Sequence, residues 1–174
     1  GHGDHADYFV DVHTGGIVGY IANHASRGTK LTIKDCAVYA NIQANCVMGG
    51  LVGEATTLAN TSLPLDIVNC IYKGSLSSLY KYSDKYPYAH SAGIAGIVNN
   101  TNDPVGKVTI ANCAAFIDSF IFNPIATTGG YGGLYSYAKK ANWIACYTPF
   151  DSATMVSTEG KKIGTYGDQV SMYG

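Results

Sequence analysis

Short segments in which apolar and polar residues alternate recur along this 174-residue chain. The clearest are LTIKDC, LDIVNC and VTIANC, which end at Cys36, Cys70 and Cys113, and a less regular version, ANWIAC, ends at Cys146. Alternation with a period of two predicts β-strands, and no window shows the period of about 3.6 residues that marks an amphipathic helix. The pattern therefore predicts an all-β chain.

A glycine element precedes each of these strands. The pattern Gly-x-x-Gly begins at Gly16, Gly50 and Gly93, each 20 residues before a cysteine, and a looser version begins at Gly130, 16 residues before its cysteine. Successive cysteines lie 34, 43 and 33 residues apart, a period typical of repeat proteins. Asn, Ser, Thr, Gly and Pro in the connecting segments favour turns. We expect a parallel β-helix-like solenoid of about four turns.

The whole chain is predicted to be one β-solenoid domain, residues 1–174. Its four repeat units are expected at approximately 8–42, 43–76, 89–120 and 127–150. A tyrosine-rich insertion, 77–88, separates units two and three, and residues 151–174 form a C-terminal tail or cap.

Stacking of the units predicts columns of equivalent residues, one strand spacing apart. We expect the four cysteines to form an inward column without a disulfide, because free cysteine behaves as a small buried apolar residue. Asn69 and Asn112, with Asp35 in the same register, are expected to form a hydrogen-bonded ladder at a corner.

The last unit contains aromatic residues that are expected to close the stack. Trp143 occupies the position of Ile33, Ile67 and Ile110, three residues before each cysteine, which indicates a core or end-capping role. Four later tyrosines are expected to cover the last turn as well: Tyr131, Tyr135, Tyr137 and Tyr147. Such a cover protects an open final strand from aggregation.

The segments GGIVG, GGLVG and AGIAG, each followed by a strand that ends in DC or NC, resemble the GLUG motif of bacterial secreted and surface proteins. The resemblance covers roughly residues 10–148. It implies a β-solenoid module of the cell surface or extracellular space, acting in adhesion or display, and the family has no catalytic residues to transfer. The chain departs from the pattern at Ala92, in place of a glycine, and at Ala145, in place of an asparagine.

Composition narrows the classes of partner. Charged residues make up 13% of the chain, the formal net charge is −1, and Lys139-Lys140 and Lys161-Lys162 are the longest basic runs, so nucleic-acid binding is not expected. No apolar run is long enough to predict a membrane-spanning segment. The five cysteines contain no CxxC pair, and neither a metal site nor a cofactor is predicted.

The tyrosine-rich insertion is the best candidate for ligand binding. Tyr80, Tyr82, Tyr86 and Tyr88 lie within nine residues, and a tyrosine offers a flat apolar face to a sugar ring and a hydroxyl to its edge. The predicted partner is a carbohydrate or a host surface protein. The alternative is that these rings fold back and cover the side of the solenoid.

A cluster near the N-terminus has the residue types of a transition-metal site. It comprises His2, Asp4, His5, Asp7, Asp11 and His13. A poorly ordered terminus followed by a strand is the simpler interpretation, because chain ends are usually poorly ordered.

Catalysis is not predicted. Cleavage of a polysaccharide on this type of fold needs paired carboxylates or carboxylates that hold calcium, and the nearest candidates are Asp84 with Lys81 and Lys85. Cys46, the one cysteine out of register, has no evident base beside it. The glycine element is not a phosphate loop, because it recurs and no GKS or GKT follows it. The prediction is a non-catalytic adhesion, binding or stalk module; the alternatives are a polysaccharide-cleaving enzyme of the parallel β-helix type and a purely structural spacer.

Overall fold

The computed structural model shows an all-β chain in which none of the described residues lies in a helix. The structure describes residues 13–23, 30–44, 47–57, 64–78, 88–100, 108–122, 128–139, 141–150, 156–157 and 170–171. Short strands that are separated by bends fill most of these ranges. The prediction of an all-β fold class is confirmed.

The described strands form four sheets, and every pairing among them is parallel. Sheet A has the order β1 (His13–Gly15), β6 (Val47–Gly49), β10 (Tyr88–Ala92), β14 (Thr128–Gly132) and β18 (Val170–Ser171). Sheet B has the order β15 (Tyr135–Lys139), β11 (Ala95–Asn100), β7 (Val52–Thr57) and β2 (Val18–Asn23).

In the other two sheets, equivalent strands of successive units also lie side by side. Sheet C has the order β16 (Ala141–Ile144), β12 (Val108–Ala111), β8 (Leu65–Val68) and β3 (Leu31–Lys34). Sheet D has the order β17 (Val156–Ser157), β13 (Ala114–Phe122), β9 (Ile71–Ser78) and β4 (Ala37–Tyr39), and β5 (Ile42–Ala44) also pairs with β9. Each strand thus pairs with the equivalent strand of the next repeat unit, an arrangement compatible with a parallel β-solenoid.

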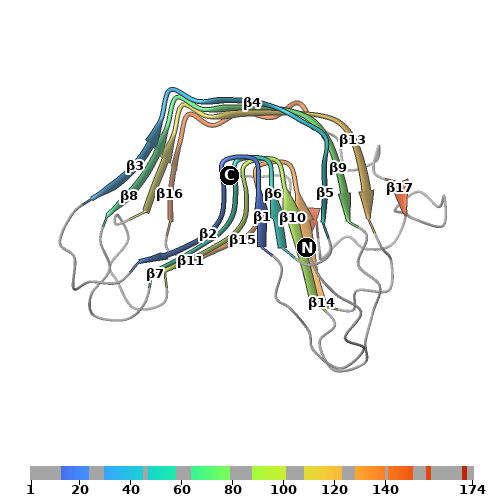
Figure 1. Ribbon diagram of the computed structural model, residues 1–174, viewed down its shortest axis with the longest axis horizontal. Helices are drawn as coiled ribbons and strands as arrows, with labels where there is room; N and C mark the ends of the chain where they lie inside the picture. The colour runs from blue at the N-terminus through green and yellow to red at the C-terminus, as the bar shows by residue number, and fades with distance from the viewer. Residues whose placement is uncertain are drawn as a thin grey trace.

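Two layers are visible in Figure 1. Sheets C and D form an outer arch, and sheets A and B form an inner layer beneath it, so that equivalent strands lie behind one another in the view. We call the bend between sheets C and D the outer corner and the bend between sheets B and A the inner corner. The buried core contains the largest fully buried side chains: Tyr72, Phe120, Met48, Leu51, Leu65, Ile67, Leu76, Ile94, Ile110 and Val47.

The register confirms the column that contains Trp143. Ile33 is paired with Ile67, Ile67 with Ile110, and Ile110 with Trp143. The indole of Trp143 is partly buried and its ring lies 4.7 Å from that of Tyr135. The tryptophan therefore continues an aliphatic core column into the fourth unit, as the sequence predicts.

The glycine alignment of the fourth unit was wrong by three residues. The backbone N–H of Gly93 donates to the carbonyl of Gly133, and Ala92 is paired with Gly132, so Gly133 and not Gly130 is the equivalent of Gly93. The reason is packing, because Leu134 then takes the buried position of Leu51 and Ile94 in the other units.

Two strands of the C-terminal tail are described. β17 pairs with β13 and β18 pairs with β14, so the tail adds a fifth strand to sheets D and A. The insertion between units two and three lies mostly outside the described residues, which resume at Tyr88.

Candidate functional site

The outer corner is bent by a residue with a left-handed backbone in every unit. The φ angles are 55° for Asp35, 55° for Asn69, 52° for Asn112 and 50° for Ala145. Asn and Asp tolerate this conformation better than other residues with a side chain. The sequence signal DC or NC thus marks a bend between two strands, and only Ala145 lacks a side chain suited to it.

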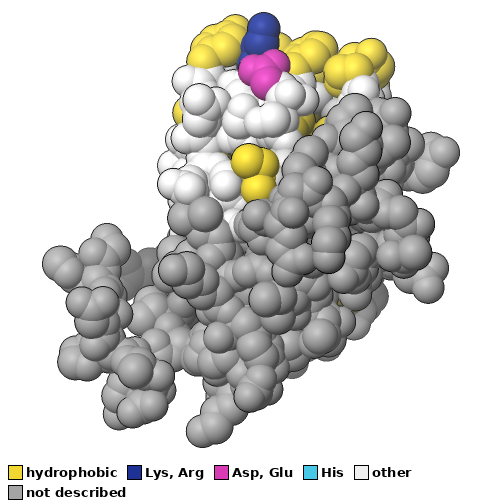
Figure 2. All heavy atoms as spheres, turned by 90° about the vertical axis from the view of Figure 1, so that its right-hand side faces the viewer, with side chains coloured by type: hydrophobic (Ala, Val, Ile, Leu, Met, Phe, Trp, Pro, Cys, Tyr) yellow, Lys and Arg dark blue, Asp and Glu magenta, His cyan; other side chains and the backbone are white. Residues whose placement is uncertain are grey.

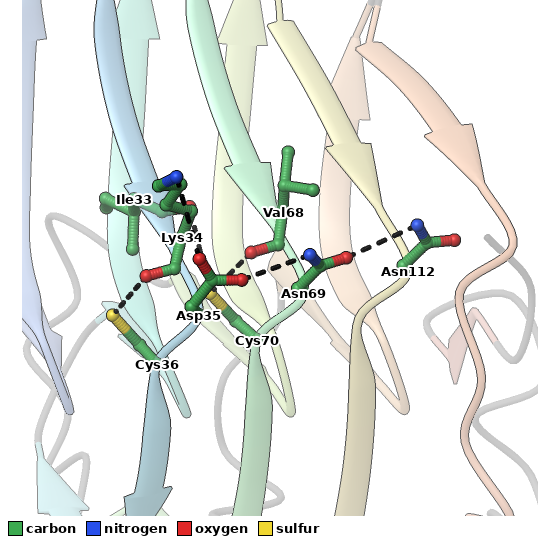
Figure 3. Close-up of polar contacts among 8 residues, drawn as sticks. All are labelled: Ile33, Lys34, Asp35, Cys36, Val68, Asn69, Cys70 and Asn112. Atoms are coloured by element: carbon green, nitrogen blue, oxygen red, sulfur yellow. Dashed lines mark hydrogen bonds and ion pairs between the residues drawn. The ribbon is translucent and has the colours of Figure 1, made fainter.

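The side chains at this corner form the predicted ladder (Figure 3). The Asn112 amide donates to Asn69 Oδ1 at 3.3 Å, and the Asn69 amide donates to Asp35 Oδ1 at 3.1 Å. Lys34 Nζ lies 3.7 Å from Asp35 Oδ2. Every donor in this amide ladder points toward the first unit, and the carboxylate of Asp35 is its final acceptor because it has no N–H to pass on.

Exposed apolar and aromatic side chains lie on the outer surface of sheet D beside the ladder. Tyr39 is 72% exposed and Tyr147 is 57% exposed. The register places Tyr39 next to Lys73 and Lys73 next to Phe116, whose ring lies 6.1 Å from that of Tyr147. We call Tyr39, Lys73, Phe116 and Tyr147 the outer aromatic row. Figure 2 shows hydrophobic side chains gathered along the upper edge of the molecule, with basic and acidic side chains among them.

A column of free thiols lies directly behind the ladder. Cys70 and Cys113 are buried, whereas Cys36 and Cys146 are only partly buried. The prediction of an inward column without a disulfide is confirmed, but the two end cysteines are less covered than expected because each has a neighbouring unit on one side only. Burial raises the pKa of the Cys70 thiol.

Polar contacts at the inner corner connect sheets A and B. His13 Nε2 lies 2.6 Å from Glu54 Oε2, and His90 Nδ1 lies 2.8 Å from Ser136 Oγ. The Ser136 hydroxyl donates to the Gly130 carbonyl at 2.5 Å, so its oxygen accepts the proton of His90 Nδ1. His90 therefore does not act as a base toward Ser136. Burial lowers the pKa of His90 to about 4.

Most of the site residues expected from the sequence lie outside the described residues. Tyr80, Tyr82 and Tyr86 are among them, and Tyr88 begins β10 with a side chain that is not described. Also outside are His2, Asp4, His5, Asp7, Asp11, Cys46, Lys81, Asp84 and Lys85. These predictions stay predictions.

The tyrosines expected to cover the last unit divide into two pairs. Tyr131 is buried, and Tyr135 is partly buried against Trp143. Tyr137 and Tyr147 are exposed, so their expected covering role was wrong. Their positions agree with this result, because both are in register with residues of the third unit that are only partly buried, Ile97 and Ala114.

Sequence reasoning missed the outer aromatic row. Tyr39, Lys73 and Phe116 each stand three residues after a cysteine, and Tyr147 stands one residue after. Because side chains alternate across a strand, both offsets place a side chain on the outward face of sheet D. Counting outward positions after each cysteine would have found the row.

Three of the described carboxylates have separate partners. Asp35 ends the amide ladder, Glu54 contacts His13, and Asp66 forms an ion pair with Lys30. Within the described ranges, no group of three or more His, Cys, Asp and Glu side chains is placed to hold one metal ion. The part of the chain that the structure describes also contains no helix long and apolar enough to cross a membrane.

No protein-family description, curated protein or solved structure matches this chain. The resemblance to the GLUG motif therefore stays a prediction, and function is inferred from the geometry of the outer corner.

Proposed function

We propose that the chain is a parallel β-solenoid of about four turns built from GLUG-type repeats, and that it is a non-catalytic module of a bacterial cell surface or secreted protein. Its ligand is a carbohydrate, which binds along the outer corner. The observation that carries this proposal is the pair of exposed rings, Tyr39 and Tyr147, on a sheet surface beside an exposed amide ladder.

The chemistry of this surface suits a sugar. A tyrosine ring offers an apolar face for the C–H groups of a pyranose, and its hydroxyl can bond to the rim of the sugar. Side-chain amides donate and accept hydrogen bonds to hydroxyl groups. The Asn112 oxygen lies on the side of its amide away from Asn69 (Figure 3), and the equivalent residue of the fourth unit, Ala145, has no amide to donate to it. It is therefore the ladder acceptor best placed to receive a ligand hydroxyl.

The geometry suits an elongated ligand. Equivalent residues of neighbouring units are about 4.8 Å apart, so the units of Tyr39 and Tyr147 are separated by about 14 Å along the stacking direction. Backbone pairing holds both residues at the corner: the N–H of Tyr147 donates to the carbonyl of Cys113, and Tyr39 is paired with Lys73 in sheet D. A surface held in this way loses little entropy when a chain-like ligand binds.

A glycan array with the purified protein tests the proposal. Tyr39→Ala and Tyr147→Ala are each expected to weaken binding of the selected glycan by about tenfold or more, because each removes a contact ring. Tyr20→Ala is the matched control, since Tyr20 is 47% exposed but lies on sheet B. Absence of any bound glycan, or an equal loss in the control, would contradict the proposal.

The same array separates the outer corner from the tyrosine-rich insertion. A variant with Tyr80, Tyr82, Tyr86 and Tyr88 changed to alanine is expected to retain binding if the outer aromatic row is the site. If only that variant loses binding, and Tyr39→Ala and Tyr147→Ala do not, the glycan-binding site lies in the insertion. Incubation of the bound glycan with the protein is expected to release no shorter products, and release would favour the polysaccharide-cleaving alternative.

A further inference from the structure

The thiols of the outer corner make repeated contacts with backbone carbonyls, and Cys36 makes the first of them, its sulfur lying 3.1 Å from the Lys34 oxygen. Cys70, Cys113 and Cys146 each approach the carbonyl two residues earlier in the chain, at 3.3, 3.3 and 3.6 Å. Each also approaches a carbonyl of the preceding unit, at 3.7, 3.5 and 3.4 Å. Because the contacts repeat, the side chains share one orientation, and the sulfur atoms are separated by the strand spacing of about 4.8 Å.

This spacing is wrong for a disulfide. An S–S bond is about 2.05 Å long and needs Cβ atoms about 3.8 Å apart, closer than two parallel side chains on neighbouring strands can come. A linear sulfur–metal–sulfur unit is different, because two metal–thiolate bonds in line, each near the length of about 2.3 Å known for zinc, give a sulfur separation of about 4.6 Å. The sulfur spacing in the column therefore agrees with that of a linear sulfur–metal–sulfur unit to within a few tenths of an ångström.

We propose that the thiol column binds soft monovalent cations, Cu(I) or Ag(I), each held in linear coordination between the sulfur atoms of two neighbouring units. Thiolate sulfur is the ligand that selects such cations. Linear coordination needs two ligands, so it is compatible with the lack of any group of three or more metal-binding side chains in the described part of the chain.

Two pairs can form without sharing a sulfur, Cys36 with Cys70 and Cys113 with Cys146. Each pair has one partly buried thiol, Cys36 or Cys146, through which a cation can enter. When the cation binds, one S–H bond breaks and its proton leaves to solvent, while the second sulfur coordinates as a neutral thiol. The charge of the buried pair then stays at zero, which avoids the cost of a buried ion.

Titration with Ag(I) in a chloride-free, oxygen-free buffer measures the stoichiometry. The protein carries Cys46→Ser, so that the four column thiols are the only ones present. We expect two silver ions per chain after gel filtration, two sulfur ligands per silver by X-ray absorption, and no retained Zn²⁺, because zinc requires a tetrahedral set of ligands. Four silver ions per chain would overturn the proposal, since each thiol would then bind alone.

Two double variants with the same number of thiols test adjacency. Cys36→Ser with Cys70→Ser leaves the neighbours Cys113 and Cys146 and is expected to retain one silver ion. Cys70→Ser with Cys113→Ser leaves only the two outermost thiols and is expected to retain none. If this variant does not fold, Cys36→Ser with Cys113→Ser also leaves two non-adjacent thiols and replaces it. Equal silver content in adjacent and non-adjacent variants would refute linear pairing.

Discussion

Both corners of the cross-section turn the chain from one sheet into the next, but they use different kinds of residue. At the outer corner, Asp35, Asn69 and Asn112 turn the chain with a positive φ, and their side chains bond to one another along the stack. At the inner corner, Gly50 and Gly93 turn the chain where an added Cβ would lie within 3.0 Å of backbone oxygen and of side-chain carbon atoms. One corner depends on the presence of a side chain, and the other on its absence.

The polar contacts of the two corners also differ in direction. The amide ladder runs along the stacking direction and is exposed. The contacts of His13 with Glu54 and of His90 with Ser136 run from sheet A to sheet B and are partly buried. We therefore expect added volume or protonation at the inner corner to lower the stability of the protein, and loss of the side-chain amides to lower it at the outer corner.

The largest expected effect is that of a methyl group at the inner corner. In Gly50→Ala the new Cβ lies within 3.0 Å of the Gly93 carbonyl oxygen and of the Tyr72 ring. Tyr72 is fully buried and its hydroxyl is hydrogen-bonded, so the ring cannot move aside. We expect a loss of about 4 kcal/mol in the free energy of unfolding, measured by denaturant titration, or failure to fold.

Gly49→Ala is the control for this substitution. Gly49 is paired with Ala92, so the third unit already has a methyl group at the equivalent position. A Cβ at Gly49 would lie within 3.0 Å of the Val52 carbonyl oxygen, but it would meet no buried ring, and the bend of the third unit accommodates the Cβ of Ala92. We therefore expect a smaller loss than for Gly50→Ala. Equal losses would mean that contact of the Cβ with backbone atoms, which both positions share, and not contact with Tyr72 sets the cost.

A pH effect is expected at the inner corner from His90. Burial lowers its pKa from 6.5 to about 4. Below pH 6.5 the unfolded chain takes up a proton that the folded protein does not, so stability falls with pH until about pH 4. Between pH 7.5 and pH 5 we expect a loss of about 2 kcal/mol, measured by urea titration. His90→Gln should remove this part of the pH dependence, and an unchanged profile would show that another group causes it.

At the outer corner, Asn69 combines a backbone role with two ladder bonds. Asn69→Ala loses the side chain suited to the left-handed backbone as well as the two ladder bonds, and it is expected to destabilise the protein by about 1.5 kcal/mol. Asn69→Gly keeps an easy left-handed backbone and loses only the bonds, so it should cost less than the alanine variant. If glycine costs as much as alanine, the ladder bonds and not the backbone conformation determine the effect.

Repetition in the sequence predicts features that occur in every unit. The ladder of Asp35, Asn69 and Asn112 and the core position of Trp143 could be predicted, because stacking places residues at the same offset from a cysteine in one column. These features require only that the units be aligned with one another, and the DC and NC signals align them. The prediction fails where one unit lacks the shared residue.

Two failures show this limit. The fourth unit was aligned on Gly130 instead of Gly133 because GYGG contains several glycines. The burial of Leu134 in its core column decides the register, and the sequence carries no separate signal for it. The outer aromatic row was missed because Tyr39, Lys73 and Phe116 share a position but not a residue type. Exposed positions outside the ladder vary between units because neither a packed core nor a hydrogen bond along the stack restricts them.

The smallest expected effect, and the only gain, is at Ala145. An alanine with a φ of 50° is strained by about 1 kcal/mol relative to a residue suited to this conformation. Ala145→Asn removes that strain and places an amide donor beside the Asn112 oxygen, so the ladder would extend into the fourth unit. We expect the free energy of unfolding to rise by about 1 kcal/mol, with a higher Tm in a thermal scan.

Ala145→Asp separates the two contributions. Aspartate tolerates the left-handed backbone as asparagine does, but its carboxylate has no hydrogen to donate to the Asn112 oxygen. Since every donor in the ladder points toward the first unit, aspartate suits only the position that ends the ladder, which Asp35 occupies. The asparagine variant should therefore be the more stable of the two, and equal stabilities would show that the outer corner is stabilised by backbone conformation alone.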